Sequence, residues 1–321
     1  MMKYTKKQNG INTMFQFFPS DSLPKGLPIS TPITFAFIGQ NLVITQKKNG
    51  WWDVPGGKIE EGESWVEALK RETREETGAI IDHIKIMGYI LAKNTGDSSS
   101  FLYPKTNILP VTLSFVKSVD HNWNKKETIN RDAPARDEVK KLFQQRNDSG
   151  QLLEIFEYVI KNYESQNYEY IFEYMRNNKM LKKIQNTQSV VFIKTKDNKF
   201  VLVRESNNSK FTLPGGGCHM DETGFDCAVR ESLEESQLEI INVQFLGAVL
   251  VKVIKDGIVL SKSIQERYVA ETRDTKKFIP NKNGFETVER KFVEFNDLQK
   301  EVEMLQNITG EEILVDLKKY L

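Results

Sequence analysis

Residues 55–79 read PGGKIEEGESWVEALKRETREETGA, and residues 214–238 read PGGGCHMDETGFDCAVRESLEESQL. The two stretches place the same residue types at the same spacing, 159 positions apart. Each has a Pro-Gly-Gly turn, then a Glu, then an Arg-Glu pair, and finally two adjacent Glu residues. The shared charged residues are Glu63, Arg71, Glu72, Glu75 and Glu76 in the first copy and Glu222, Arg230, Glu231, Glu234 and Glu235 in the second.

The glutamate spacing predicts one acidic helix face in each copy. Positions i, i+3 and i+4 share a face of an α-helix, so Glu72, Glu75 and Glu76 converge within roughly 5–6 Å at Cβ. Mg²⁺ or Mn²⁺ takes oxygen ligands and often bridges to phosphates, and Arg71 can hold a carboxylate in a fixed fork. A Glu-rich helix is usually a solvated, salt-bridged face, but the duplication favours two divalent-metal sites.

Both helices carry end signals. Ser64 and Glu67 have the spacing of a capping box, and Thr223 begins a weaker version in the second copy. Gly78 suits a left-handed end of the first helix. The second copy has Gln237 there, which we expect to cost about 1 kcal/mol in that conformation without removing a ligand. The glycine turn before each helix lets the backbone approach a metal or a phosphate.

The pattern G-x5-E-x7-R-E-U-x-E-E-x-G-U, in which U is apolar, is the box of the Nudix hydrolases, and this chain resembles a tandem Nudix protein. The first box, Gly57 to Ala79, departs from the pattern at Thr73; the second, Gly216 to Leu238, departs at Ser232 and Gln237. The resemblance implies an α+β or α/β fold, with two Nudix-fold α/β/α sandwich domains that have mixed β-sheets and are joined by a helical linker.

The resemblance also implies roles for the box residues, all ten of which are candidate catalytic residues. The implied metal ligands are the Gly56 carbonyl with Glu72, Glu75 and Glu76, and the Gly215 carbonyl with Glu231, Glu234 and Glu235. Glu63 and Glu222 would orient the sites or bind a further ion, and Arg71 and Arg230 would brace the carboxylates. The family's general base varies in position, so Glu138, Glu286 and Glu289 are candidates.

The implied reaction is Mg²⁺- or Mn²⁺-dependent hydrolysis of the pyrophosphate linkage in a nucleoside diphosphate derivative or a nucleoside triphosphate. The lead-in from Trp52 to Glu60 resembles that of MutT-type triphosphate hydrolases, although many members share it. The sequence marks of ADP-ribose, dinucleoside polyphosphate, NADH and coenzyme A members are missing. In the long loop 93–110, Phe101 or Tyr103 could stack on a base.

Alternative functions stay open. One domain could be catalytic and the other a nucleotide-sensing regulatory domain, and Gln237 favours the second half as the regulator. A purely sensing protein is disfavoured because such proteins usually lose box glutamates and neither box has lost one. Removal of a 5′-pyrophosphate from RNA is a further option, although the chain has no obvious basic stripe to hold RNA.

Composition limits the class of protein. Hydrophobic residues make up 39% and charged residues 28%, which is typical of a soluble globular protein. The net charge of +1 gives no basic footprint, so we expect a small nucleotide substrate, no DNA partner, and RNA only as a disfavoured one. An 18-residue apolar run and the apolar core of a signal peptide are both missing, so we expect neither a membrane span nor secretion.

The two cysteines, Cys218 and Cys227, both lie in the second box. Such low usage suits a reducing cytoplasm and argues against a disulfide framework. A zinc site with His219 fits no common ligand spacing. We therefore expect two small packed residues.

The length of 321 residues suggests two domains, which we place at 1–150 and 186–321 with a helical linker at 151–185. Within that linker, Gln151 to Tyr163 has helical periodicity, and Tyr168 to Met175 is expected to begin a second helix. From Asn296 the chain is expected to be helical, with a break at Gly310. The expected strands are 11–18 (an edge strand), 33–38, 41–46, 80–92, 111–116, 188–194, 199–205, 249–255, 258–262, 267–272 and 289–295.

Overall fold

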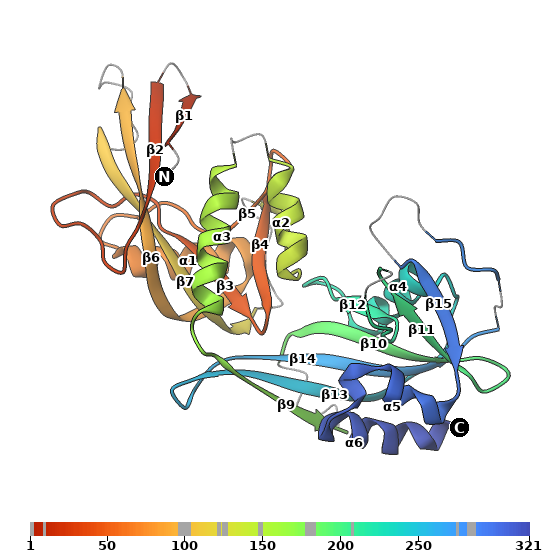
Figure 1. Cartoon of the computed structure of the whole chain (residues 1–321). Coiled ribbons are helices and arrows are strands. Elements are labelled where there is room, and N and C mark those ends of the chain that lie inside the picture. Colours follow the sequence, from red (N-terminus) through yellow and green to blue (C-terminus); the bar gives the residue numbers. More distant parts are fainter. Residues whose placement is uncertain are drawn as a thin grey trace. The chain divides into compact units, whose positions relative to one another are not determined.

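The computed structural model describes all residues except 1–2, 9–10, 96–103, 121–122, 124–127, 147–149, 177–183, 207–208, 274–275 and 281–286. The chain divides into two compact units, each with its own β-sheet and helices (Figure 1). The first unit comprises Met1–Glu169 with Val253–Ser261, and the second comprises Tyr170–Lys252 with Lys262–Leu321. Within the described ranges, no helix is long and apolar enough to cross a membrane.

The sheet of the first unit has the strand order β1-β2-β6-β7-β3-β4-β5, and β8 pairs with β4. The strands are β1 Lys3–Gln8, β2 Ile11–Pro19, β3 Ile33–Ile38, β4 Asn41–Lys47, β5 Trp52–Asp53, β6 Ala79–Thr95, β7 Thr106–Val119 and β8 Thr128–Asp132. β3 pairs in parallel with β7, whereas β2 with β6, β6 with β7, and β3 with β4 are antiparallel. The sheet is therefore mixed, as predicted.

Three helices accompany this sheet: α1 Trp65–Thr77, α2 Arg136–Gln144 and α3 Gln151–Glu164. The apolar face of α3 packs on β3, where the rings of Phe37 and Tyr163 stack at 4.2 Å. Phe35 and Phe156 approach at 6.3 Å, and all four side chains are buried. Pairs of this kind contribute about 0.5–1.5 kcal/mol beyond their buried area. Because of this packing, α3 belongs to the first compact unit.

The sheet of the second unit has the order β15-β11-β10-β14-β13-β9, and β12 pairs with β10. The strands are β9 Glu169–Met175, β10 Asn186–Lys194, β11 Phe200–Arg204, β12 Gly215–Gly217, β13 Ile241–Lys255, β14 Ile258–Glu271 and β15 Glu289–Val293. β10 pairs in parallel with β14 and antiparallel with β11. This unit thus repeats the mixed sheet of the first.

Alternate residues of β10 face two different layers of helices. Val191 and Ile193 join a cluster with Ala228 of α4 (Gly224–Ser236). Val190 and Phe192 join a second cluster with residues of the C-terminal segment, including α5 (Leu298–Glu301) and α6 (Ile308–Leu317). The period-two alternation of a strand therefore places the sheet between two helical layers, which confirms the predicted sandwich class.

Gly310 does not break the C-terminal helical segment, contrary to expectation. It is the third residue of α6, and its N–H donates to the Asn307 side chain at 2.8 Å. A Cβ at Gly310 would overlap the backbone of Leu305, so the glycine permits a close approach of two turns. The interruption lies instead at 302–307, before Asn307 caps α6.

Three further expectations are wrong. Tyr168 to Met175 does not begin a helix, because Glu169–Met175 forms β9; its aromatic and β-branched residues suit a strand, and short apolar runs fit both periods. β2 is not an edge strand, since β1 pairs along its outer side. The strands expected at 258–262 and 267–272 are both strand, but they are not separate, because they belong to the continuous β14. The other expected strands are present, and the domain limits at 150 and 186 stay a prediction.

Candidate metal centres

The helix of each box begins and ends at the predicted residues. The Ser64 hydroxyl accepts from the Glu67 N–H, and the Glu67 carboxylate accepts from the Ser64 N–H, which completes the capping box of α1. α1 ends at Gly78 with φ 71°. In α4, Thr223 caps the helix by accepting from the Asp226 N–H at 3.1 Å. The caps fix where each helix begins. The i, i+3 and i+4 spacing then places the glutamates that follow on one helix face.

Arg71 gathers three carboxylates in the first site. Its Nε and Nη2 donate to the two oxygens of Glu63, each at 3.0 Å. Its Nη1 donates to Glu72 at 2.9 Å and to Glu75 at 3.3 Å. Nη2 also donates to the Lys58 carbonyl at 2.8 Å, which ties the helix to the glycine turn. The guanidinium lowers the pKa of Glu63, chiefly through these hydrogen bonds.

Arg230 makes the same set of contacts in the second site. Its Nε and Nη2 donate to Glu222 at 2.8 Å each, and Nη1 donates to Glu231 at 2.6 Å and to Glu234 at 3.0 Å. Nη2 donates to the Gly217 carbonyl at 2.8 Å. Burial alone would raise the pKa of Glu222, but the hydrogen bonds from Arg230 and from the His219 N–H lower it.

The glycine turns lie directly against the carboxylates. The Gly56 N–H donates to Glu76 at 3.2 Å, and the Gly215 N–H donates to Glu235 at 2.8 Å. A Cβ at Gly57 would overlap the Glu72 carboxylate, and a Cβ at Gly216 would come within 2.5 Å of the Glu231 carboxylate. Both turns therefore need glycine for close approach rather than for flexibility. Each site brings together the predicted carboxylates and the glycine turn.

The two sites differ at the last glutamate. The Lys47 ammonium, at the end of β4, contacts the Glu76 carboxylate in the first site. Burial raises the pKa of Glu76, and Lys47 opposes that rise. In the second site burial is the main cause that raises the pKa of Glu235 to about 8; the carboxylates of Glu231, Glu205 and Glu234 contribute to the rise, and the Gly215 N–H opposes it. The repeated box could not reveal Lys47, because Lys47 lies before the box and the corresponding strand position in the second unit is Glu205.

In both copies, the position where the box pattern has an apolar residue holds a buried residue with a hydroxyl group. Thr73 and Ser232 are fully buried, and each donates to the carbonyl four residues earlier, at 2.7 Å to Leu69 and at 2.6 Å to Ala228. Thr77 and Ser236 repeat this bond one turn later, each at 2.5 Å. The back-bonds satisfy hydroxyls that would otherwise be buried without a partner, so the slot accepts a small polar residue.

Gln237 adopts the left-handed conformation expected at that position, with φ 56°. Its side chain also has a use that the sequence did not reveal. The amide donates to the Ile279 carbonyl at 2.7 Å and accepts from the Ile279 N–H at 3.1 Å. Gln237 therefore fixes a later segment to the end of α4, which offsets part of its conformational cost.

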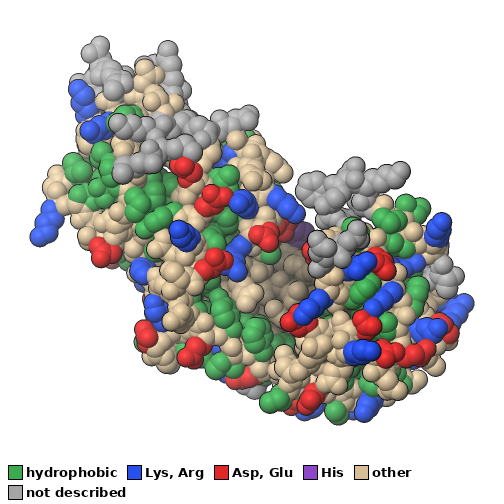
Figure 2. All heavy atoms as spheres, in the orientation of Figure 1, with side chains coloured by type: hydrophobic (Ala, Val, Ile, Leu, Met, Phe, Trp, Pro, Cys, Tyr) green, Lys and Arg blue, Asp and Glu red, His purple; other side chains and the backbone are tan. Residues whose placement is uncertain are grey.

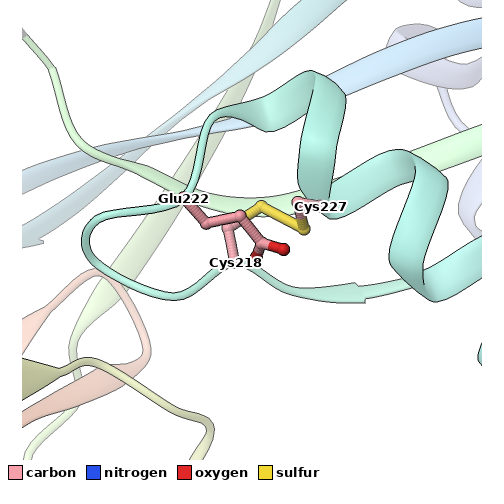
Figure 3. A group of neighbouring side chains, drawn as sticks. All are labelled: Cys218, Glu222 and Cys227. Carbon is pink, nitrogen blue, oxygen red and sulfur yellow. A yellow bond between two sulfur atoms is a disulfide. The ribbon is translucent and has the colours of Figure 1, made fainter.

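The expectation of two separate cysteines is wrong, because Cys218 and Cys227 form a disulfide. The bond joins the turn before Glu222 to the first turns of α4, and both cysteines are buried (Figure 3). One Glu222 oxygen lies within 4.8 Å of both sulfurs, a grouping that could hold a metal if the thiols were free. Bonded sulfurs are not thiolate ligands, and Arg230 already occupies Glu222.

The two described candidates for the general base, Glu138 and Glu289, do not belong to the box clusters. Glu138 is exposed on α2, and Glu289 of β15 pairs with Arg204. Glu286, Phe101 and Tyr103 lie outside the described residues. A cavity of about 530 Å³ in the first unit lies between α2 and α3, away from the box, and its lining includes the ion pairs Arg136–Glu164 and Lys140–Glu157.

The residues present suit a hard divalent cation in each site. Four carboxylates and a backbone turn converge on each box helix, and they supply the oxygen ligands that Mg²⁺ and Mn²⁺ prefer. In the described part of the chain, no cationic side chain contacts Glu235, and burial keeps its proton bound to a pH near 8. A cation there would relieve the repulsion that raises this pKa.

The chain is similar to proteins of one family. The NUDIX domain matches residues 33–152 and 184–311. The chain is 45% identical over 47 residues to the uncharacterized Nudix hydrolase YvcI of Bacillus subtilis (strain 168), which is 15% of this chain and 30% of that protein. It is 38% identical over 61 residues to the 8-oxo-dGTP diphosphatase of Buchnera aphidicola subsp. Acyrthosiphon pisum (strain APS), or 19% of this chain and 42% of that protein.

Solved structures give weaker likenesses. A mutant of the Bacillus subtilis pyrophosphohydrolase BsRppH is 17% identical with a TM-score of 0.38, covering 50% of this chain and 97% of that one. The C. elegans Ap4A hydrolase is 17% identical with a TM-score of 0.30, covering 41% of this chain and 96% of that one. The chain spans less than half the length of the two curated relatives. Since the NUDIX domain covers most of this chain in two copies, the chain belongs to the Nudix hydrolase family.

Proposed function

We propose that this protein is a Mg²⁺- or Mn²⁺-dependent hydrolase that cleaves the pyrophosphate linkage of a nucleoside triphosphate or a nucleoside diphosphate derivative. The observation that carries the proposal is the pair of arginine-braced carboxylate clusters, which have the same contacts in both units. A solvated acidic face would not require the same partly buried arginine fork and the same glycine contacts twice.

The residues that would hold the metal are the carboxylates and the turn carbonyl of each box. They are Gly56, Glu72, Glu75 and Glu76 in the first site and Gly215, Glu231, Glu234 and Glu235 in the second. The bound ion would neutralise phosphate oxygens and lower the pKa of a bound water.

The chain's own residues prepare that site. Arg71 and Arg230 hold two glutamates of each cluster at fixed positions, which limits the reorganisation needed when an anionic substrate arrives. Both oxygens of Glu63 and of Glu222 accept from the arginine, which supports an orienting role for these residues over a role as ligands. The candidate bases Glu138, Glu286 and Glu289 stay predictions.

Substrate class and location complete the proposal. The face in Figure 2 intersperses acidic and basic side chains instead of gathering basic ones into a stripe, which favours a small nucleotide over RNA. The MutT-like lead-in and the matched segment of the 8-oxo-dGTP diphosphatase favour a nucleoside triphosphate. A cytoplasmic location stays a prediction, and the bonded cysteine pair weakens the reasoning behind it.

The decisive experiment removes one glutamate from each cluster in the intact chain. Glu75→Gln with Glu234→Gln should abolish Mg²⁺-dependent release of phosphate or pyrophosphate across a panel of nucleotides, because each substitution removes one charged ligand. Glu61→Gln with Glu239→Gln changes the same charges outside the clusters and should leave hydrolysis intact. Turnover that survives in the first double variant, or in excess chelator, would contradict the proposal.

The second candidate function is a protein in which one unit is catalytic and the other senses a nucleotide and regulates it. The observation in its favour is Lys47, which adds a positive charge to the first cluster, whereas no cationic side chain among the described residues contacts Glu235. Single variants separate the candidates. If Glu75→Gln alone removes all turnover and Glu234→Gln alone changes only its nucleotide dependence, the second unit is regulatory. Additive partial losses would indicate two catalytic units.

A further inference from the structure

Lys47 brings a positive charge into the first carboxylate cluster. Its ammonium contacts one Glu76 oxygen, while the other oxygen accepts the Gly56 N–H at 3.2 Å. Glu76 is only 4% exposed, whereas the Lys47 side chain keeps 29% of its surface exposed. The carboxylate is therefore fixed in the interior, and the flexible Lys47 side chain can turn its ammonium away from Glu76 while most of its stem stays covered.

The second cluster lacks this cation. Thr45 of β4 pairs with Asp53 and Arg131, and Val203 of β11 pairs with Thr212 and Arg290, so these two positions correspond. The residue two positions after each is Lys47 in the first unit and Glu205 in the second, and Glu205 places a negative charge near Glu235. Arg204, the cation nearest to this position in sequence, pairs with Glu289. The two clusters thus have the same carboxylates, but the side chain next to the last glutamate is positively charged in the first cluster and negatively charged in the second.

A divalent ion and the Lys47 ammonium compete for the same carboxylate. When the ion binds Glu76, it repels the ammonium and removes its partner, and a lysine left without an anion in a partly buried place is unfavourable. A substrate polyphosphate supplies that anion, since Lys is a common phosphate binder. Metal and polyphosphate should therefore stabilise each other's binding at this site, as linked ligands do.

We propose, on the basis of the function proposed above, that Lys47 exchanges Glu76 for a substrate phosphate, so that the first cluster binds metal and polyphosphate cooperatively. The second cluster binds metal without polyphosphate, because no internal cation has to leave. Lys47 is therefore a positioning residue that becomes a phosphate ligand only in the complex. Substrates with at least two adjacent phosphates fit this role, because one phosphate engages the metal and the next engages Lys47.

The test measures Mn²⁺ binding to the intact protein by calorimetry and by the EPR signal of free Mn²⁺, with and without the hydrolysis-resistant imidodiphosphate. Glu76→Gln and Glu235→Gln assign each affinity class to its cluster. Without imidodiphosphate, the second cluster should bind Mn²⁺ at least about tenfold more tightly than the first. With it, the first should tighten by at least about tenfold, within the usual range of coupling between sites.

Two substitutions change the same charge at neighbouring lysines. Lys47→Met should tighten Mn²⁺ binding at the first cluster and remove its dependence on imidodiphosphate. Lys48→Met, at an exposed neighbour, should change neither, and it also corrects for Mn²⁺ bound by imidodiphosphate in solution. Glu205→Lys, at the position that corresponds to Lys47 in strand register, should transfer the dependence to the second cluster, so the proposal stays testable if Lys47→Met fails to fold.

Each outcome has a defined meaning. Equal affinities in the unmodified protein, or equal effects of Lys47→Met and Lys48→Met, would overturn the role of Lys47. Two unequal Mn²⁺ classes without any nucleotide hydrolysis would leave that role intact and reject only the proposed function. If neither cluster binds Mn²⁺, both proposals fail.

Discussion

The two box helices agree in every contact that the motif prescribes and differ in the residues around it. Arg71 and Arg230 each bind three carboxylates and one carbonyl of the glycine turn. Outside the pattern, Lys47 corresponds to Glu205, and Ile59 and Ala68 correspond to the bonded Cys218 and Cys227. Within the pattern, Gly78 corresponds to Gln237. The comparison shows that the spacing determines the internal geometry of a cluster, whereas its charge and its rigidity are set by residues outside the spacing.

The largest expected effect tests the shared part of the comparison. Gly57→Ala and Gly216→Ala should each reduce the hydrolysis attributable to their own site by about 100-fold, because the new Cβ displaces a carboxylate by an ångström or so. The measurement is the initial rate with Mg²⁺ in the background of the opposite site inactivated. Gly217→Ala is the matched control, since nothing lies within 4 Å of a Cβ there. Equal rates in Gly216→Ala and Gly217→Ala would refute the contact.

The disulfide should make the two units differ in their response to reductant. Cys218 and Cys227 are separated by nine positions, so their bond should stabilise the second unit by about 2–3 kcal/mol through loop closure. Hydrogen exchange of peptides from α1 and α4 in urea, with and without reductant, reports each unit separately. Reduction should increase exchange in α4 alone, and Cys218→Ala with Cys227→Ala should remove the difference. A response in α1 of the same size would contradict the assignment.

The last glutamates predict a pH effect that should be stronger in the second unit. The folded pKa of Glu235 is raised to about 8, above its unfolded value of about 4.3, so the folded state holds a proton that the unfolded state has lost. The free energy of unfolding of the metal-free second unit should therefore fall as pH rises from about 4 to about 8, and then level off. Glu235→Gln should remove this component in urea titrations at a series of pH values. Identical pH profiles for both proteins would sink the prediction.

The smallest effect concerns the helix ends. Gln237→Gly relieves a left-handed side chain by about 1 kcal/mol but loses two hydrogen bonds to Ile279, so the net change in stability should be within about 1 kcal/mol. Gly78→Ala should destabilise the first unit by more than that, because its Cβ would overlap Arg131 Nη1 and approach the Asp120 carbonyl at 2.6 Å. Urea midpoints for the two variants provide the measurement. A larger loss for Gln237→Gly would reverse this ranking.

The sequence predicted the parts of this protein that depend on local periodicity. The i, i+3, i+4 spacing placed the glutamates on one helix face, and the capping residues located both ends of α1. Lys47 was not predictable in this way, because it reaches Glu76 of α1 from the end of the strand β4 and its counterpart in the second unit is Glu205. The disulfide escaped prediction because low cysteine content argued against pairing, although Cys218 and Cys227 lie on adjacent turns. The strand β9 was mistaken for a helix because seven residues cannot distinguish the two periods.

One feature of the chain path limits how its halves can be studied. Residues 253–261 belong to the first compact unit although they follow most of the second in sequence. A stop codon placed between the two boxes would therefore remove part of the first unit along with the whole of the second. Such a truncated protein could lose activity because its first unit is incompletely folded, and this loss could not be told apart from the loss of the second box. Point substitutions in the full-length polypeptide are consequently the cleaner genetic tool.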